Sequence, residues 1–179
     1  STQVQKLEQR KSELSNQLDS LKDTADKNEK AAEIARQNAQ TNGILSGRLA
    51  ATGEGVVIRI SQGSKQKIDS AILFTLLEEL RNSGAEVIEI NNVRVVTSTY
   101  ISGTAGSLVC DGTKLKSPFT IRAIGDSDNL QNAVNLAGGV GSRLKVKYGA
   151  TVSVSPSDKV MIKSTRQAPQ YTYAHVIGQ

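Results

Sequence analysis

Two arginines, Arg94 and Arg122, are the residues of this 179-residue chain best suited to bind a ligand. Each stands in a predicted strand; hydroxyl side chains follow the first, and a turn that begins a helix follows the second. Two guanidinium groups beside hydroxyls and a helix N-terminus can hold a phosphate or a carboxylate. The alternative is that each arginine pairs with an acid, such as Glu89 or Asp126, and fixes a hairpin. The predicted anion site comprises Arg94, Thr97, Thr99 and Arg122.

Other motifs that resemble catalytic or metal sites have simpler explanations. The acids at 126 and 128 stand at the start of a predicted helix, and Gln131 follows Asp128 by three residues, which is typical of helix capping. The glycines at 138–141 follow a helix and lack the spacing of a phosphate-binding loop. His175 is the only histidine, and neither Gly-x-Ser-x-Gly nor His-Glu-x-x-His occurs. We therefore predict that the protein is not an enzyme and that it has neither a cofactor nor a metal site.

The cysteine and aromatic content of the chain limits which residues and bonds can stabilise its core. Cys110 is the only cysteine, so an internal disulfide and a thiolate metal cluster are both excluded. It lies in a predicted strand, where a lone cysteine behaves as a small buried hydrophobe. Aromatic residues make up 3% of the chain and tryptophan is absent. The core is therefore predicted to be aliphatic.

The charge of the chain is uneven. The net charge is +5, yet residues 1–45 hold seven basic and seven acidic residues, so the excess lies in the later part. Six late basic residues are opposed there only by Asp158: Arg143, Lys145, Lys147, Lys159, Lys163 and Arg166. Such a cluster is usually a solvated surface, and otherwise faces anionic lipid, an anionic wall polymer or an acidic partner. Nucleic acid is not predicted as a partner, because a basic helix and an aromatic, basic sheet face are both missing.

The first part of the chain predicts one long helix with a seven-residue apolar repeat. Neither proline nor glycine occurs before Gly43, which is expected to end the helix near residue 42. Lys11 and Asn28 are the two polar interruptions of the repeat. A stripe this narrow is typical of a coiled coil, so we predict a homo-oligomer; the alternative is a helix folded back onto its own domain. The residues predicted to carry self-association are Val4, Leu7, Leu14, Leu18 and Leu21.

The rest of the chain predicts an α+β fold. The order of elements indicates a ferredoxin-like βαββαβ antiparallel sheet with helices packed on one face and an added hairpin. Two-residue turns are expected at Asn91-Asn92 and Asp111-Gly112, and residues 53–55 are expected to form a turn. We predict a coiled-coil stalk at 1–45, a globular domain at 46–166 and a polar tail at 167–179. The strands are predicted at 56–60, 87–90, 93–96, 108–110, 113–115, 119–124, 151–154 and 159–162, the helices at 68–80 and 127–136, and a helix or strand at 142–148.

Two motifs of this domain point to a family. They are Arg94-x-x-Thr-Ser-Thr and the run Arg-Ala-Ile-Gly-Asp at 122–126, which follows Ser-Pro-Phe at 117–119. Residues 40–164 resemble bacterial domain-of-unknown-function family 881, which includes the YlxW and YlxX proteins of Gram-positive bacteria. The resemblance implies an N-terminal membrane anchor, a coiled coil and a domain outside the cytoplasm, with genes that often neighbour cell-division genes. It implies no enzymatic activity. The chain opens on Ser1 without an initiator methionine, so we expect an upstream anchor segment.

Together these inferences predict a non-enzymatic, membrane-tethered interaction or scaffold protein. It is expected at the extracytoplasmic face of the cell membrane, linked to cell division or envelope assembly, with a division or envelope protein as partner. The alternative function is a sensor domain that binds a small anion through Arg94 and Arg122.

Overall fold

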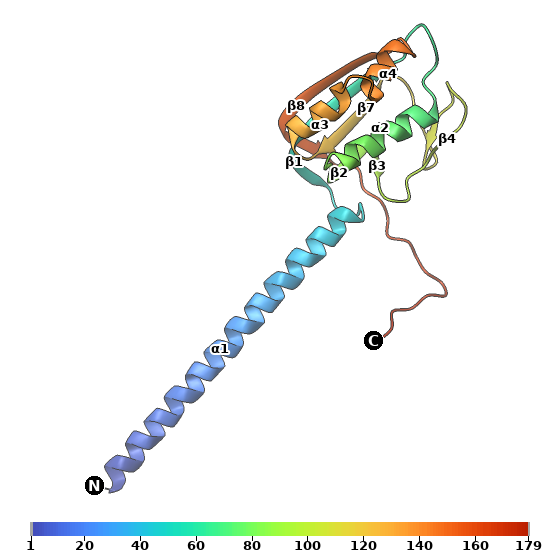
Figure 1. The fold of residues 1–179 in the computed structure, drawn as a ribbon. Helices are drawn as coiled ribbons and strands as arrows, with labels where there is room; N and C mark the ends of the chain where they lie inside the picture. Colours follow the sequence, from blue (N-terminus) through green and yellow to red (C-terminus); the bar gives the residue numbers. More distant parts are fainter. Residues whose placement is uncertain (1, 179) are drawn as a thin grey trace. The chain divides into compact units, whose positions relative to one another are not determined.

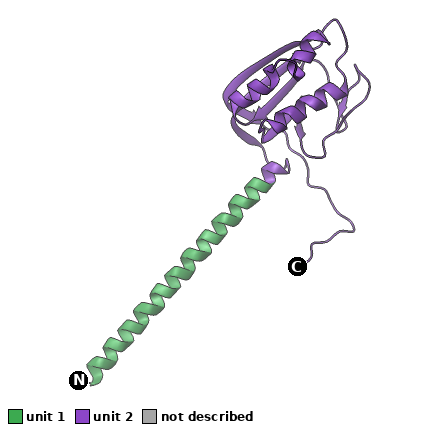
Figure 2. Cartoon of the chain, in the orientation of Figure 1, with its two compact units in different colours: residues 1–42 green, residues 43–179 purple. Residues whose placement is uncertain are grey.

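The computed structural model describes residues 2–178 and divides the chain into two units, residues 1–42 and 43–179 (Figure 2). Ser1 and Gln179, the outer ends of the predicted stalk and tail, lie outside the described residues. The fold class is α+β, as predicted: a long N-terminal helix is followed by antiparallel sheets with further helices.

Helix α1 runs without interruption from Thr2 to Leu45. Every described residue of its first unit, from 2 to 42, is exposed. The prediction that Gly43 ends the helix is wrong, because Gly43 is itself helical and it is Gly47 that has a positive φ of 78°. The carbonyl oxygen of Gly43 accepts from the backbone N–H groups of Arg48 and Leu49, at 2.8 and 3.1 Å. The chain therefore leaves the helix a turn later than the sequence indicated.

The main sheet has five antiparallel strands in the order β3-β2-β7-β1-β8. Helices α2, α3 and α4 cover one of its faces (Figure 1). Between this face and the helices lies an aliphatic core, as predicted, with fully buried residues such as Ile58, Leu73, Ile121 and Leu130. The bounds are β1 Ala51–Ser61, α2 Ser70–Asn82, β2 Val87–Ile90, β3 Val93–Val95, β7 Phe119–Ile124, α3 Ser127–Asn135, α4 Val140–Val146 and β8 Thr151–Ile162.

A second, smaller sheet contains β4 (Ile101–Ser102), β5 (Val109–Cys110) and β6 (Thr113–Lys114). The two predicted tight turns are present. Asn91 and Asn92 have φ values of 45° and 63°, and Asp111 and Gly112 have 47° and 86°. Both central residues of a type I′ hairpin turn need positive φ, which asparagine, aspartate and glycine tolerate best.

Helix α3 begins at the predicted residue, Ser127, whereas α2 begins at Ser70, two residues later than predicted. The Asp69 side chain caps α2 by accepting from the Ile72 N–H at 2.9 Å. Asp126 caps α3 in the same way, from the Asn129 N–H at 2.9 Å, so the capping interpretation of this acidic pair is confirmed. The segment at 142–148, left open between helix and strand, lies mostly in α4.

Strands β1 and β8 differ most from the prediction. The expected turn at 53–55 lies within β1, where the pairing register shifts between Gly53 and Gly55, and the two predicted strands at 151–154 and 159–162 are one strand, β8. Glycines in β1 and Pro156 in β8 suggested breaks, but proline is tolerated on an edge strand and glycine at a bulge. Beyond the shift, two β8 side chains pack on the sheet face away from the helices, in a small apolar cluster that includes Val87, Ile124, Val160 and Ile162.

Candidate functional site

The two candidate arginines lie in one row across the main sheet. Arg94 in β3 pairs with Glu89 in β2, and Glu89 pairs with Arg122 in β7. The row continues to Val57 in β1 and Ser155 in β8. Residues paired directly across antiparallel strands share a face, so all five side chains belong to the face that the helices leave uncovered.

Arg94 is buried, and its guanidinium is satisfied within the protein. Its side chain is only 2% exposed and donates to three backbone carbonyl oxygens, those of Ile44, Leu49 and Ser164, each at 2.9 Å. Burial lowers the pKa of Arg94, and the charge of nearby Glu89 partly opposes this effect. The structure thus uses Arg94 to hold two backbone segments that are distant in sequence.

The two threonines of the predicted anion site differ in burial. Thr97 is exposed, whereas Thr99 is buried and its hydroxyl accepts from the Val96 N–H at 2.7 Å. Arg166 reaches the same hydroxyl at 3.5 Å, donates from Nε to the Arg94 carbonyl at 2.8 Å, and forms an ion pair with Asp111. We call Arg94 and Arg166, with these partners, the Arg94–Arg166 clamp. Sequence reasoning missed it, because its acceptors are mostly backbone carbonyls.

Asp111 completes the clamp from the small sheet. Burial alone would raise its pKa, but hydrogen bonds from the Tyr100 N–H and from Arg166 lower the pKa below the usual value. The Tyr100 N–H lies 3.0 Å from its carboxylate. Asp111 is therefore charged and holds Arg166 in place.

Arg122 forms an ion pair with Glu89. This is the alternative to an anion site that the sequence also allowed. The distance from Arg122 Nη1 to Glu89 Oε1 is 3.1 Å, and Ser164 Oγ donates to Glu89 Oε2 at 2.5 Å. The Glu89 side chain is 4% exposed, while that of Arg122 is 31% exposed. The carboxylate is thus satisfied on both oxygens, and the other nitrogens of Arg122 remain accessible.

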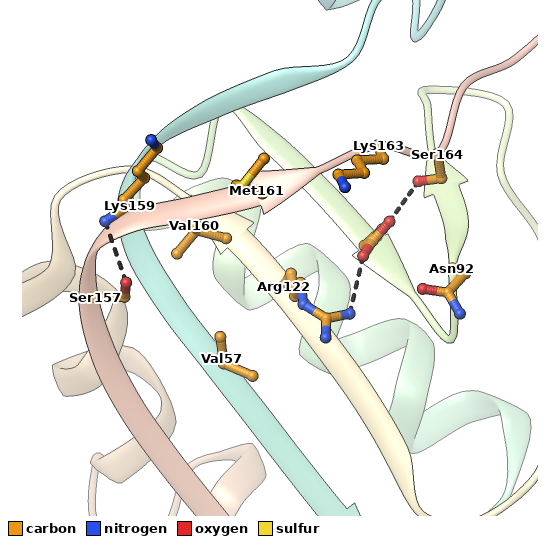
Figure 3. A pocket seen from close by; sticks show the side chains of 10 residues that line it. Val57, Asn92, Arg122, Ser157, Lys159, Val160, Met161, Lys163 and Ser164 are labelled. Carbon is orange, nitrogen blue, oxygen red and sulfur yellow. Dashed lines mark hydrogen bonds and ion pairs between the residues drawn. The ribbon is translucent and has the colours of Figure 1, made fainter.

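The exposed part of Arg122 lines a groove on the uncovered face of the sheet, and this groove has a volume of about 650 Å³ (Figure 3). Its floor comes from β1, β2 and β7, and one wall is the last part of β8 and the residues after it. Figure 3 shows the Lys163 side chain at the same end of the groove as Arg122. The lining residues are Val57, Glu89, Asn92, Arg122, Ser157, Lys159, Val160, Met161, Lys163 and Ser164.

The late basic cluster seen in the sequence is divided among several places. Arg143 and Lys145 lie on α4, on the helical side of the sheet, and Lys147 lies over the Tyr148 ring at 5.5 Å. Arg166 is engaged by Asp111. Of the six residues, Lys159 and Lys163 alone line the groove.

Cys110 is buried in β5, as expected for a small hydrophobe. Burial and the neighbouring Asp111 raise the pKa of its thiol to about 11, against the weaker effect of Arg166. A thiol with so high a pKa is a poor nucleophile at neutral pH. Within residues 2–178, three or more His, Cys, Asp or Glu side chains do not gather as a metal site would require. The helices described there also include none that is both long and apolar enough to cross a membrane.

The structure is that of an α+β protein with a long exposed helix. In the domain that follows, arginine side chains join distant segments through hydrogen bonds to backbone carbonyl groups. The profile of a family described as "Bacterial protein of unknown function (DUF881)" matches residues 38–175. The chain belongs to this family, and the resemblance drawn from its motifs is confirmed. The family is uncharacterised, and nothing in the comparisons points to catalysis.

Several relatives share most of this chain. The UPF0749 protein Rv1825 of Mycobacterium tuberculosis is 34% identical over 169 residues, which is 92% of this chain and 57% of that protein. The UPF0749 protein YlxW of Bacillus subtilis is 30% identical over 65% of this chain and 54% of that protein. The chain thus spans little more than half the length of these relatives. A crystal structure of an uncharacterized conserved protein from Mycobacterium tuberculosis is similar with a TM-score of 0.71 and 35% identity, covering 78% of this chain and 99% of that one.

Proposed function

We propose that this protein is a non-enzymatic interaction or scaffold protein that self-associates through helix α1. We further propose that it acts at the extracytoplasmic face of the cell membrane, tethered by a segment outside this chain, with a division or envelope protein as partner. The cellular setting is supported by the family resemblance. Self-association is supported by the helix itself.

The observation that carries the proposal is the exposed leucine stripe of α1. Leu7, Leu14, Leu18 and Leu21 lie on the a and d positions of one heptad register, and their exposed fractions are 67, 60, 53 and 68%. Every described residue around them on the helix is also exposed. A narrow apolar stripe on a long exposed helix is stabilised by pairing with a similar stripe on another helix, because this contact removes the apolar side chains from water.

The size of the effect follows from the remaining exposure. Burying the exposed half of a leucine side chain contributes about 1 kcal/mol. Four leucines from each of two helices therefore contribute roughly 8 kcal/mol before the entropic cost of association is subtracted. This gross contribution is comparable with the cost of association itself, so the loss of two leucines should be enough to prevent pairing.

The test is the solution mass of the Leu14→Asp, Leu18→Asp double variant, measured by light scattering. We expect the unaltered chain to be oligomeric and the double variant to be monomeric, since aspartates within the seam bury charge without a partner. A matched control, Asn16→Asp with Ser20→Asp, adds the same two charges at the same spacing on the opposite side of α1 and should stay oligomeric. A monomeric unaltered chain, or a double variant of unchanged mass, contradicts the proposal.

For the domain we propose the ferredoxin-like class, with β3 and the small sheet as additions. The support is the order β8-β1-β7-β2 within the main sheet, with a helix between β1 and β2 and two helices between β7 and β8. This is the arrangement of a split βαβ unit, in which one antiparallel strand separates two parallel ones.

A further inference from the structure

The groove beside Arg122 has a charge that the protein itself leaves unbalanced. Three cations line it, Arg122, Lys159 and Lys163, against one carboxylate, Glu89. Glu89 accepts from Arg122 and from Ser164, so both of its oxygens are already used. The lining residues therefore carry two positive charges in excess, and among the described residues neither lysine forms an ion pair. Figure 3 shows the Lys159 side chain at the far end of the groove, directed away from Arg122, so an anion would be held at the end where Arg122 and Lys163 lie.

The remaining donors suit a phosphate group. Nε and Nη2 of Arg122 lack a partner within the described protein, and Figure 3 shows the Lys163 side chain at the same end of the groove. Figure 3 shows the Ser157 hydroxyl at the other end of the groove, where it accepts from the Lys159 N–H at 3.1 Å and keeps its own hydrogen to donate to the body of a ligand. A phosphate monoester carries about two negative charges at neutral pH and offers three acceptor oxygens, whereas a carboxylate carries one charge and offers two.

The rest of the lining limits the body of the ligand. Among the described residues that line the groove, none has an aromatic side chain on which a nucleobase could stack. The groove does contain the amide of Asn92, hydroxyl groups, and the apolar surfaces of Val57 and Met161. Its volume of about 650 Å³ is within the range of small-molecule sites. These features fit a compact molecule that carries hydroxyl groups.

We propose that this groove binds the phosphate monoester of a sugar or polyol, with Arg122 and Lys163 holding the phosphate. Of the two arginines expected to bind an anion, Arg94 is occupied by three carbonyls, which leaves Arg122 for this role. The site lies entirely in residues 43–179 and does not depend on self-association through α1.

The test is isothermal titration calorimetry of the full chain with glucose 6-phosphate at low salt. Lys163→Glu should weaken binding by roughly tenfold or more, because it replaces a cation at the phosphate with an anion. The matched control is Lys145→Glu, which makes the same charge change on an exposed α4 residue outside the groove and should change the affinity less than about twofold. Arg122→Lys keeps a positive charge beside Glu89, so the fold is retained, but it should weaken binding several-fold because the planar donor pair is lost.

Three further ligands complete the test. Glucose should not bind, inorganic phosphate should bind more weakly than the ester, and adenosine monophosphate should bind no better than glucose 6-phosphate. Equal effects of Lys163→Glu and Lys145→Glu would overturn the site. Equal binding of inorganic phosphate and the ester would overturn the sugar or polyol body, and tighter binding of adenosine monophosphate would overturn the non-aromatic class.

Discussion

Replacing Arg94 with methionine tests whether the Arg94–Arg166 clamp stabilises the domain. Methionine keeps much of the side-chain volume but removes all three donors. The carbonyl oxygens of Ile44, Leu49 and Ser164, each 2.9 Å from the guanidinium, lose their partner. Glu89 keeps Arg122 and Ser164, so a buried unpaired carboxylate is not created.

The expected loss can be worked out from these contacts. An unsatisfied buried carbonyl costs about 1–3 kcal/mol. Leu49 lies in an exposed stretch, so water can replace the lost donor there, and removal of a buried charge recovers part of its desolvation cost. We therefore expect the free energy of unfolding to fall by about 3 kcal/mol, a large share of the roughly 5–15 kcal/mol typical of a domain. With a urea slope of about 2 kcal/mol per molar, the midpoint should fall by about 1.5 M.

Urea unfolding followed through the Cys110 thiol is the suitable assay. Cys110 is fully buried in the main core and is the only thiol, so its labelling reports unfolding of the domain and is insensitive to α1. Arg94→Lys is the control: one ammonium group can still reach part of the carbonyl set, so its midpoint should lie between the other two. A midpoint for Arg94→Met within about 0.3 M of the unaltered chain would refute the reasoning, since it would mean that the three contacts contribute almost nothing.

Two further predictions concern the sheets. Gly55→Ala should lower the free energy of unfolding by about 2 kcal/mol, because a Cβ there would overlap the Ala123 carbonyl; Gly139→Ala, where the nearest atom would be 3.0 Å away and φ is −80°, should cost much less in the same urea titration. The raised pKa of Cys110, about 11 against an ordinary 9.0, means that the unfolded thiol ionises first, so stability should fall as the pH rises from about 9 to about 11. Urea unfolding followed by far-UV circular dichroism between pH 8 and 11 should show a smaller fall in the free energy of unfolding for Cys110→Ala than for the unaltered chain; an identical pH dependence would contradict the assigned burial of this thiol.

Much of the local structure is determined by short-range sequence. The helix caps at Asp69 and Asp126 and the turns at 91–92 and 111–112 depend on residue types that satisfy nearby N–H groups or tolerate positive φ. The long helix requires only the absence of glycine and proline over 42 residues. The 91–92 turn also implies that Glu89 lies opposite Arg94, since a two-residue turn fixes the register of its strands.

The extent of β1 and β8 could not be read in the same way. Glycine and proline within them are typical of breaks, and only the pairing of these two distant strands makes them a continuous bent pair. The groove depends on this bend, because residues 157–164 form its wall while its floor comes from β1, β2 and β7.

The sequence by itself therefore determined the stalk helix, the α+β class, the aliphatic core and the family. The tertiary structure decided what each arginine does. Arg94 is satisfied by carbonyls from residues 44, 49 and 164, and Arg166 by Asp111 and by the backbone of Arg94. Backbone carbonyls are present at every position and leave no mark in the sequence, so only the fold shows which of them an arginine meets.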